Sequence, residues 1–277
     1  MGWEALGQWG DDAARIKALT GGVANDVWSV RVNGQIAVGR LGSRTDADLA
    51  WESELLQHLD REGMAVPVPI PTTDGRLFVD GLMVMKYMEG GPPETESDWR
   101  RLADTVHQLH RLTEGWPQRP GWQSSIDLLH AVTGTRIDLA AMPPEGVIRC
   151  RAAWARLIGR QTCVVHGNPN NPSNTRMTAD RIALIDWDES HVDVPDLDLV
   201  LPDNAANLDD AADGKSRSDQ FAIHLQQSAE RGGNRHEEAI LDERANQRIG
   251  RVGPIGISLF EIAPVHLAVC VHDLANP

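Results

Sequence analysis

The chain has 277 residues, 41% of them hydrophobic, which is enough to bury a core in one bilobal domain or two small domains. Its formal charge is -14, because 40 acidic residues outnumber 26 lysines and arginines. Nucleic acids and anionic membranes bind to clustered positive charge, so this balance argues against both partners. A neutral or cationic small molecule fits it better.

Two further features indicate the compartment. Cys150, Cys163 and Cys270 are far apart and show no metal-ligand or redox spacing, and an odd number of cysteines suits a reducing environment. The sequence also has no apolar run of the length of a signal peptide or of a membrane span, which needs roughly 18 residues. We therefore expect a cytoplasmic protein.

The N-terminal region predicts strands followed by a helix. Two alternating runs flank Asn33-Gly34, a pair that accepts the positive φ angles of a type I′ turn, so residues 28–41 should form a β-hairpin. Leucines at helical spacing then predict a helix that begins at Thr45 or Asp46 and ends at Gly63.

The next elements surround a Gly/Pro boundary at residues 90–93. A second hairpin is expected about Asp80-Gly81, before this boundary. After it, a helix pattern has Ser97 as its N-cap, and its two histidines, His107 and His110, are expected to pack or to lie at the surface. Further helices are expected over 149–160 and, in a polar and irregular tail, around 219–230 and 236–247.

The most informative stretch is a polar loop between an apolar strand and a second strand at 182–185. Carboxylate and amide oxygens are magnesium ligands, and magnesium needs only one or two from the protein when phosphates supply the others. The stretch therefore suits phosphoryl transfer. The alternative is a turn in which Asn and Pro only satisfy backbone conformations. The polar residues are His166, Asn168, Asn170, Asn171, Asn174, Asp186 and Asp188.

Two motifs in this stretch carry a resemblance to a known family. The segments HGNPNNPSN (166–174) and ALIDWDE (183–189) resemble the His-Gly-Asp and Ile-Asp-Trp motifs of the aminoglycoside phosphotransferase and choline kinase-like family, including its actinobacterial members. The resemblance covers roughly residues 15–205. It implies an α+β, bilobal, protein-kinase-like fold with a small antiparallel-sheet N-lobe and a larger, mainly helical C-lobe.

The resemblance also implies lobe boundaries and cofactors. Residues 1–91 would form the nucleotide-binding lobe, and residues 92–277 the second lobe, with a catalytic loop over 164–190 and a divergent tail over 208–277. The cofactors would be ATP and Mg²⁺, and the acceptor a hydroxyl of a neutral or cationic small molecule.

Carried over by motif position, Asn174 and Asp186 would bind the metal and His166 would orient the catalytic loop. Asn168 stands at the place of the family's catalytic aspartate and would contact the acceptor. An amide cannot accept the acceptor's proton as a carboxylate can, whereas phosphoryl transfer depends mainly on positioning and electrostatics. We therefore expect slow turnover. A neighbouring carboxylate could replace the missing one: Asp186, Asp188, Asp193, Asp196 or Asp198.

The resemblance further implies the nucleotide contacts. Gly21 and Gly22 would let the backbone approach the phosphates, and Arg40 would meet the α- and β-phosphates. The expected partner of Arg40 is Glu52, a place that Glu54 contests. Residues 84–91 match the hinge that pairs with adenine, through Met85, Tyr87 and Met88.

Two alternatives remain open. Asn168 also suits a pseudokinase, a catalytically impaired module that binds a nucleotide or metabolite for regulation. The other alternative is an unrelated α/β protein with an Asn-rich loop. The tail at 208–277 departs from the long helices that complete the family's substrate pocket, so the sequence does not identify the acceptor.

Overall fold

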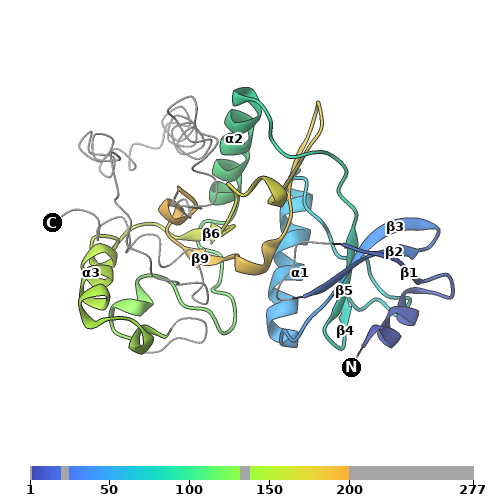
Figure 1. Ribbon diagram of the computed structural model, residues 1–277, viewed down its shortest axis with the longest axis horizontal. Helices are drawn as coiled ribbons and strands as arrows, with labels where there is room; N and C mark the ends of the chain where they lie inside the picture. The colour runs from blue at the N-terminus through green and yellow to red at the C-terminus, as the bar shows by residue number, and fades with distance from the viewer. Residues whose placement is uncertain (1, 20–24, 132–137, 200–277) are drawn as a thin grey trace. The chain divides into compact units, whose positions relative to one another are not determined.

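A computed structural model describes residues 2–19, 25–131 and 138–199 (Figure 1). The chain divides into two compact units, each built from segments that are separated in sequence. The first unit comprises Met1–Pro92, Arg119–Gly121 and Ser173–Trp187, and the second comprises Pro93–Gln118, Trp122–Pro172 and the chain from Asp188 onward. Within the described ranges, no helix has both the length and the apolar character needed to cross a membrane.

The first unit contains a five-stranded antiparallel sheet in the order β1-β2-β3-β5-β4 (Figure 1). Both predicted hairpins are confirmed, since Asn33 and Gly34 have φ of 51° and 72° and Asp80 and Gly81 have φ of 51° and 82°. The strand β1 was not predicted. The strands are β1 (Ala14–Ala18), β2 (Asp26–Val32), β3 (Gln35–Leu41), β4 (Phe78–Val79) and β5 (Leu82–Lys86).

Each face of this sheet is covered by a different helix. The 3₁₀ helix η1 (Trp3–Trp9) packs Leu6 and Trp9 with alternate apolar residues of β2, β3 and β5. Residues of the other face, including Met83, pack with Leu49 of α1 (Asp46–Arg61). Thr45 is the N-cap of α1, so the first of the two predicted caps is the correct one.

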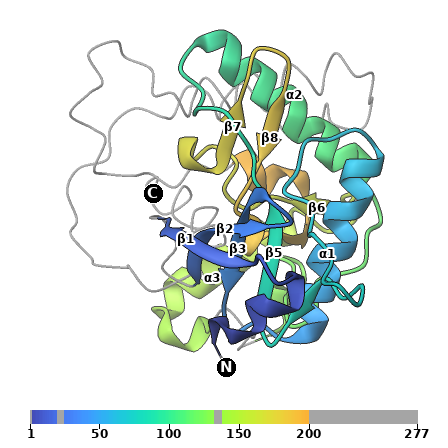
Figure 2. The same cartoon turned by 90° about the vertical axis from the view of Figure 1, so that its right-hand side faces the viewer.

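A small hairpin completes the first unit. Its strands β7 (Thr175–Met177) and β8 (Ile182–Leu184) are antiparallel neighbours (Figure 2). Gly91 and Met177 exchange backbone hydrogen bonds of 3.1 and 2.7 Å. Gly90 has φ of 128°, and a Cβ there would lie 2.5 Å from the Met177 carbonyl oxygen, so this close approach requires glycine.

The second unit contains α2 (Glu96–Leu112), α3 (Pro144–Ala155) and a two-stranded sheet of β6 (Cys163–Val165) and β9 (His191–Asp193). Cys163 is buried, and burial raises the pKa of its thiol well above the usual value. Short 3₁₀ helices lie in the connections: η2 (Asp127–Leu129), η3 (Leu139–Ala141), η4 (Pro172–Asn174), η5 (Trp187–Glu189) and η6 (Pro195–Leu199).

Two helix boundaries differ from the prediction. The N-cap of α2 is Thr95 rather than Ser97, because Thr95 and Asp98 form a capping box in which each side chain accepts the other's backbone N–H. The helix predicted over 149–160 begins earlier, with Pro144 at its first position, and ends before Arg156.

Candidate active site

Arg40 of β3 and Glu52 of α1 form a buried ion pair in the first unit. Nη2 of Arg40 donates a 2.6 Å hydrogen bond to Oε1 of Glu52, and the two side chains are only 7% and 0% exposed. Glu54, the competing partner in the sequence analysis, is exposed. The packing of α1 against the sheet therefore selects Glu52, which lies on the buried side of the helix.

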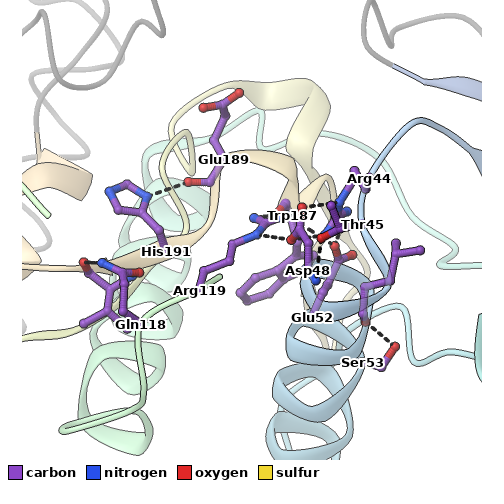
Figure 3. Close-up of polar contacts among 12 residues, drawn as sticks. Arg44, Thr45, Asp48, Glu52, Ser53, Gln118, Arg119, Trp187, Glu189 and His191 are labelled. Atoms are coloured by element: carbon purple, nitrogen blue, oxygen red, sulfur yellow. Dashed lines mark hydrogen bonds and ion pairs between the residues drawn. The ribbon is translucent and has the colours of Figure 1, made fainter. Parts of the chain in front are cut away.

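Two more arginines, Arg44 and Arg119, lie beside Glu52 and Asp48 (Figure 3). Arg44 pairs with both Glu52 and Asp48, and Arg119 pairs with Asp48. Burial raises the pKa of Glu52, but the charges of Arg40, Arg44 and Arg119 outweigh it and hold that pKa below its ordinary value. The sequence analysis missed both arginines, and Arg119 lies in a Pro-, Gly- and Trp-rich stretch without a periodic signal.

Asn174 and Asp186 lie at the same end of the β7–β8 hairpin. Thr175 pairs with Leu184 in the ladder, and the backbone N–H of Ile185 donates a 2.8 Å hydrogen bond to the carbonyl oxygen of Asn174. Asn174 is buried, whereas Asp186 is exposed and has φ of 66°. A left-handed conformation outside a hairpin turn is a feature that clusters at functional sites.

These two side chains fit a magnesium ion that is held partly by phosphates. An amide oxygen and a carboxylate are both hard donors, and magnesium bound to a nucleotide takes only one or two ligands from the protein. The described residues contain no group of three or more His, Cys, Asp or Glu side chains that could hold a metal.

The predicted hinge residues span the end of β5, since Met85 lies within the strand and Tyr87 and Met88 follow it. Met85 and Met88 are buried and Tyr87 is 43% exposed. Among the described residues, the backbone hydrogen bonds outside helices and strands involve neither Tyr87 nor Met88.

In the second unit, Asp198 holds the backbone at the start of the polar loop. Its carboxylate accepts the N–H of His166 at 3.0 Å and the N–H of Gly167 at 2.8 Å, and Nε2 of His110 lies 2.8 Å away. Burial raises the pKa of Asp198, but the hydrogen bond from His110 and the neighbouring His110 and His166 charges lower it below the ordinary value. An ionised carboxylate only accepts, so Nε2 of His110 is the donor.

His110 therefore has a more specific place than the packing or surface position that the sequence predicted. It is 88 residues from Asp198, and no local pattern could connect them. His166 is fully buried, and Asn168, two residues further along the loop, has intermediate exposure.

The structure also separates the five candidate replacement carboxylates. Asp193 accepts the backbone N–H groups of Ser125 and Val194, and Asp198 is engaged as described, so both are buried and satisfied by the protein. Burial raises the pKa of Asp196, whose Oδ2 lies 3.8 Å from Nη2 of Arg160. Asp186 and Asp188 are more accessible.

Two sets of predicted features lie outside the described residues. They are the phosphate-loop glycines Gly21 and Gly22, and the tail at 208–277 with its helices around 219–230 and 236–247.

The five-stranded antiparallel sheet and the helices form an α+β architecture, which solved structures of kinases share. An amicoumacin kinase, hAmiN, in complex with AMP-PNP, Ca²⁺ and Ami, matches with a TM-score of 0.58 and 15% identity over 80% of this chain and 72% of that one. Choline kinase LicA from Streptococcus pneumoniae matches with a TM-score of 0.54 and 16% identity over 80% and 78%. These matches confirm the predicted bilobal, protein-kinase-like fold class.

The family follows from the sequence. The model of the phosphotransferase enzyme family (APH) matches residues 15–222, and the chain belongs to this family. A curated relative, an uncharacterized protein of Deinococcus radiodurans, is 28% identical over 174 residues. That alignment covers 55% of this chain and 50% of the relative, so the chain matches half the length of this relative.

Proposed function

We propose that this protein transfers the γ-phosphate of ATP, with Mg²⁺, to a hydroxyl of a small molecule. The observation that carries the proposal is that one unit contains both the buried Arg40–Glu52 pair and a hairpin end that presents Asn174 and Asp186. A fixed cation for phosphates and oxygen donors for a metal are the recurring parts of phosphoryl transfer. An AMP-PNP complex of the matching amicoumacin kinase supports the choice of nucleotide.

In this mechanism Arg40 meets phosphate oxygens, and the Tyr87–Met88 backbone meets the adenine. Magnesium, when bound, neutralises charge on the phosphates. Asn168 accepts a hydrogen bond from the acceptor hydroxyl and orients it. The hydroxyl oxygen forms a bond to the γ-phosphorus, the bond to the ADP oxygen breaks, and the hydroxyl proton passes to the transferred phosphoryl group. Because the transition state is loose, positioning without a strong base supports slow turnover.

We propose residues 1–91 as the nucleotide-binding lobe and residues 92–277 as the C-terminal lobe, with the catalytic loop over 164–190 and a divergent tail over 208–277. The net charge of -14 favours a neutral or cationic acceptor, and the matching choline kinase and aminopropanol kinase bear names of that chemistry. The aminopropanol kinase match has a TM-score of 0.57 and 15% identity over 81% of this chain and 79% of that one. A cytoplasmic location, with its supply of ATP and Mg²⁺, goes with this proposal.

The test is calorimetric binding of ATP with Mg²⁺, followed by ADP release with a panel of amino alcohols and aminoglycosides. Asp186→Asn is the informative variant, because asparagine tolerates the left-handed backbone and lacks only the charge. Asp60→Asn, an exposed position on α1, is the matched control. We expect Asp186→Asn to weaken binding only when Mg²⁺ is present.

The same experiment separates the alternatives. If the wild type does not bind ATP, the proposal is wrong. If the wild type binds ATP without turnover and Asn168→Asp releases ADP, the protein is a nucleotide-binding pseudokinase. If the wild type releases ADP, Asn168 is sufficient for the reaction.

A further inference from the structure

Arg119 is a fully buried arginine that contacts two separate elements of the first unit (Figure 3). Its Nε donates a 2.5 Å hydrogen bond to Oδ1 of Asp48 on α1, and its Nη1 donates a 3.1 Å hydrogen bond to the carbonyl oxygen of Trp187. Its Nη2 lies 3.8 Å from Oε2 of Glu52. Burial lowers the pKa of Arg119, yet the guanidinium stays charged because its ordinary value is far above neutral.

Arg119 reaches the proposed metal site through the carbonyl group of Trp187. Trp187 directly follows Asp186, whose left-handed φ of 66° costs energy that neighbouring contacts must offset. On one side of Asp186, the backbone N–H of Ile185 donates a hydrogen bond to the carbonyl oxygen of Asn174. On the other side, the Trp187 indole donates to the Leu184 carbonyl and the Trp187 carbonyl accepts from Arg119. The backbone of Asp186 is therefore fixed at both of its neighbours.

The other two contacts of the same guanidinium are on α1, one turn apart. Asp48 and Glu52 lie on the helix that presents Glu52 to Arg40. Arg119 thereby connects α1, whose Glu52 pairs with Arg40 of β3, to the backbone that carries Asp186. Arg119 donates two hydrogen bonds and has a third acceptor at ion-pair distance, a spread that a planar guanidinium allows and the single point of a lysine ammonium does not.

Arg44 and Arg119 also affect how the charge of Glu52 is balanced when Arg40 binds phosphates. If Arg40 turns from Glu52 to the phosphates, Glu52 would become a buried carboxylate without its partner, which is a strongly unfavourable state. Arg44 and Arg119 remain beside Glu52 in that case. Arg40 can then exchange partners while Glu52 stays neutralised.

We propose that Arg119 is a positioning residue of the phosphotransferase site, which holds Asp186 in register with the Arg40–Glu52 pair. The inference rests on the proposed function. Its proposed action is indirect, through the backbone next to Asp186 and through Glu52.

The experiment compares ATP binding with Mg²⁺ and with a chelator, by calorimetry, in Arg119→Lys and in the wild type. Loss of a residue that orients a metal ligand typically lowers metal affinity about tenfold or more. In Arg119→Lys we expect the increase in ATP affinity caused by Mg²⁺ to fall about tenfold. The affinity for ATP measured with the chelator should change less than about twofold. Arg100→Lys, an exposed arginine paired with Glu96 on α2, is the control and should leave both values unchanged.

A double-mutant cycle tests the route through Asp186. In an Asp186→Asn background, Arg119→Lys should have no further effect on the Mg²⁺-dependent increase, since the ligand it positions is already lost. Additive effects, or an unchanged Mg²⁺ increase in folded Arg119→Lys, overturn the inference. If Arg119→Lys does not fold, Asp48→Asn takes its place. An unchanged Mg²⁺-dependent increase in ATP affinity in that variant also overturns the inference. Absence of ATP binding by the wild type instead contradicts the proposed function.

Discussion

Asp198 of η6 holds three groups through one carboxylate: the imidazole of His110 on α2 and the backbone N–H groups of His166 and Gly167. This carboxylate anchors the loop in which Asn168 lies. Replacing Asp198 by Asn removes the charge and presents donors toward donors, so we expect a loss of about 3 kcal/mol in the free energy of unfolding. Urea unfolding followed by tryptophan fluorescence measures it.

The control for this variant is Asp104→Asn, at an exposed position of α2. It should change stability by less than about 0.5 kcal/mol. Equal stabilities of the Asp198 and Asp104 variants would show that the anchor contributes nothing.

Glu52 is surrounded by Arg40, Arg44 and Arg119, whereas Glu54 on the same helix is exposed. Glu52→Gln leaves buried guanidinium groups without a matching charge, and we expect it to cost about 3 kcal/mol. Glu54→Gln, the same chemical change two residues away, should cost less than about 0.5 kcal/mol. Thermal and urea unfolding of both variants give the comparison, and a similar loss in both would contradict the network.

The pH dependence of stability follows from the same carboxylates. The pKa values of Glu52, Asp48 and Asp198 are held below the ordinary carboxyl values of about 4, so the unfolded chain takes up protons first as the pH falls. Their contribution to the free energy of unfolding is full above about pH 5. It is lost as the pH falls below about 4 and through the lowered pKa values of the folded state.

Asp196 acts in the opposite direction because burial raises its pKa, so the comparison must be between variants. Urea unfolding of Glu52→Gln and Glu54→Gln between pH 7 and pH 3 should show a flatter pH dependence for Glu52→Gln. Parallel curves for the two variants would mean that Glu52 is not a source of acid sensitivity.

Gly90 and Gly91 are adjacent glycines with different tolerance. A methyl group on Gly90 would meet the Met177 backbone at 2.5 Å from a φ of 128°, whereas a Cβ on Gly91 has nothing within 4 Å. We expect Gly90→Ala to destabilise by about 2 kcal/mol or more and Gly91→Ala to be near neutral. Thermal unfolding measures both, and equal midpoints would sink this reading of the close approach.

Much of the fold could be predicted from local chemistry. Asn33-Gly34 and Asp80-Gly81 gave the hairpins because their turns demand positive φ at adjacent residues, and this requirement is visible in the sequence. The cap of α2 was misplaced because Thr95 and Ser97 both have cap chemistry, and only the reciprocal bond with Asp98 decides between them. The strand β1 was missed because its alternating run, ARIKA, is only five residues long, and all five residues are exposed.

The site divides in the same way. The family motifs predicted Asn174 and Asp186 as metal ligands, a role that stays a prediction, and the hairpin register brings the two residues to one end. The contacts of Arg119 with Asp48 and of His110 with Asp198 span 71 and 88 residues. Such pairs arise from tertiary packing, so neither residue carries a local pattern that marks its partner.

The edge strand β1 affects how this protein behaves in solution. It ends the described sheet, and an exposed edge offers unpaired backbone groups to a strand of another molecule. Here the register shifts between Arg15 and Lys17, and both side chains are charged and exposed. An irregular edge that carries positive charge is a poor template for strand addition, so we expect little strand pairing with another molecule along β1.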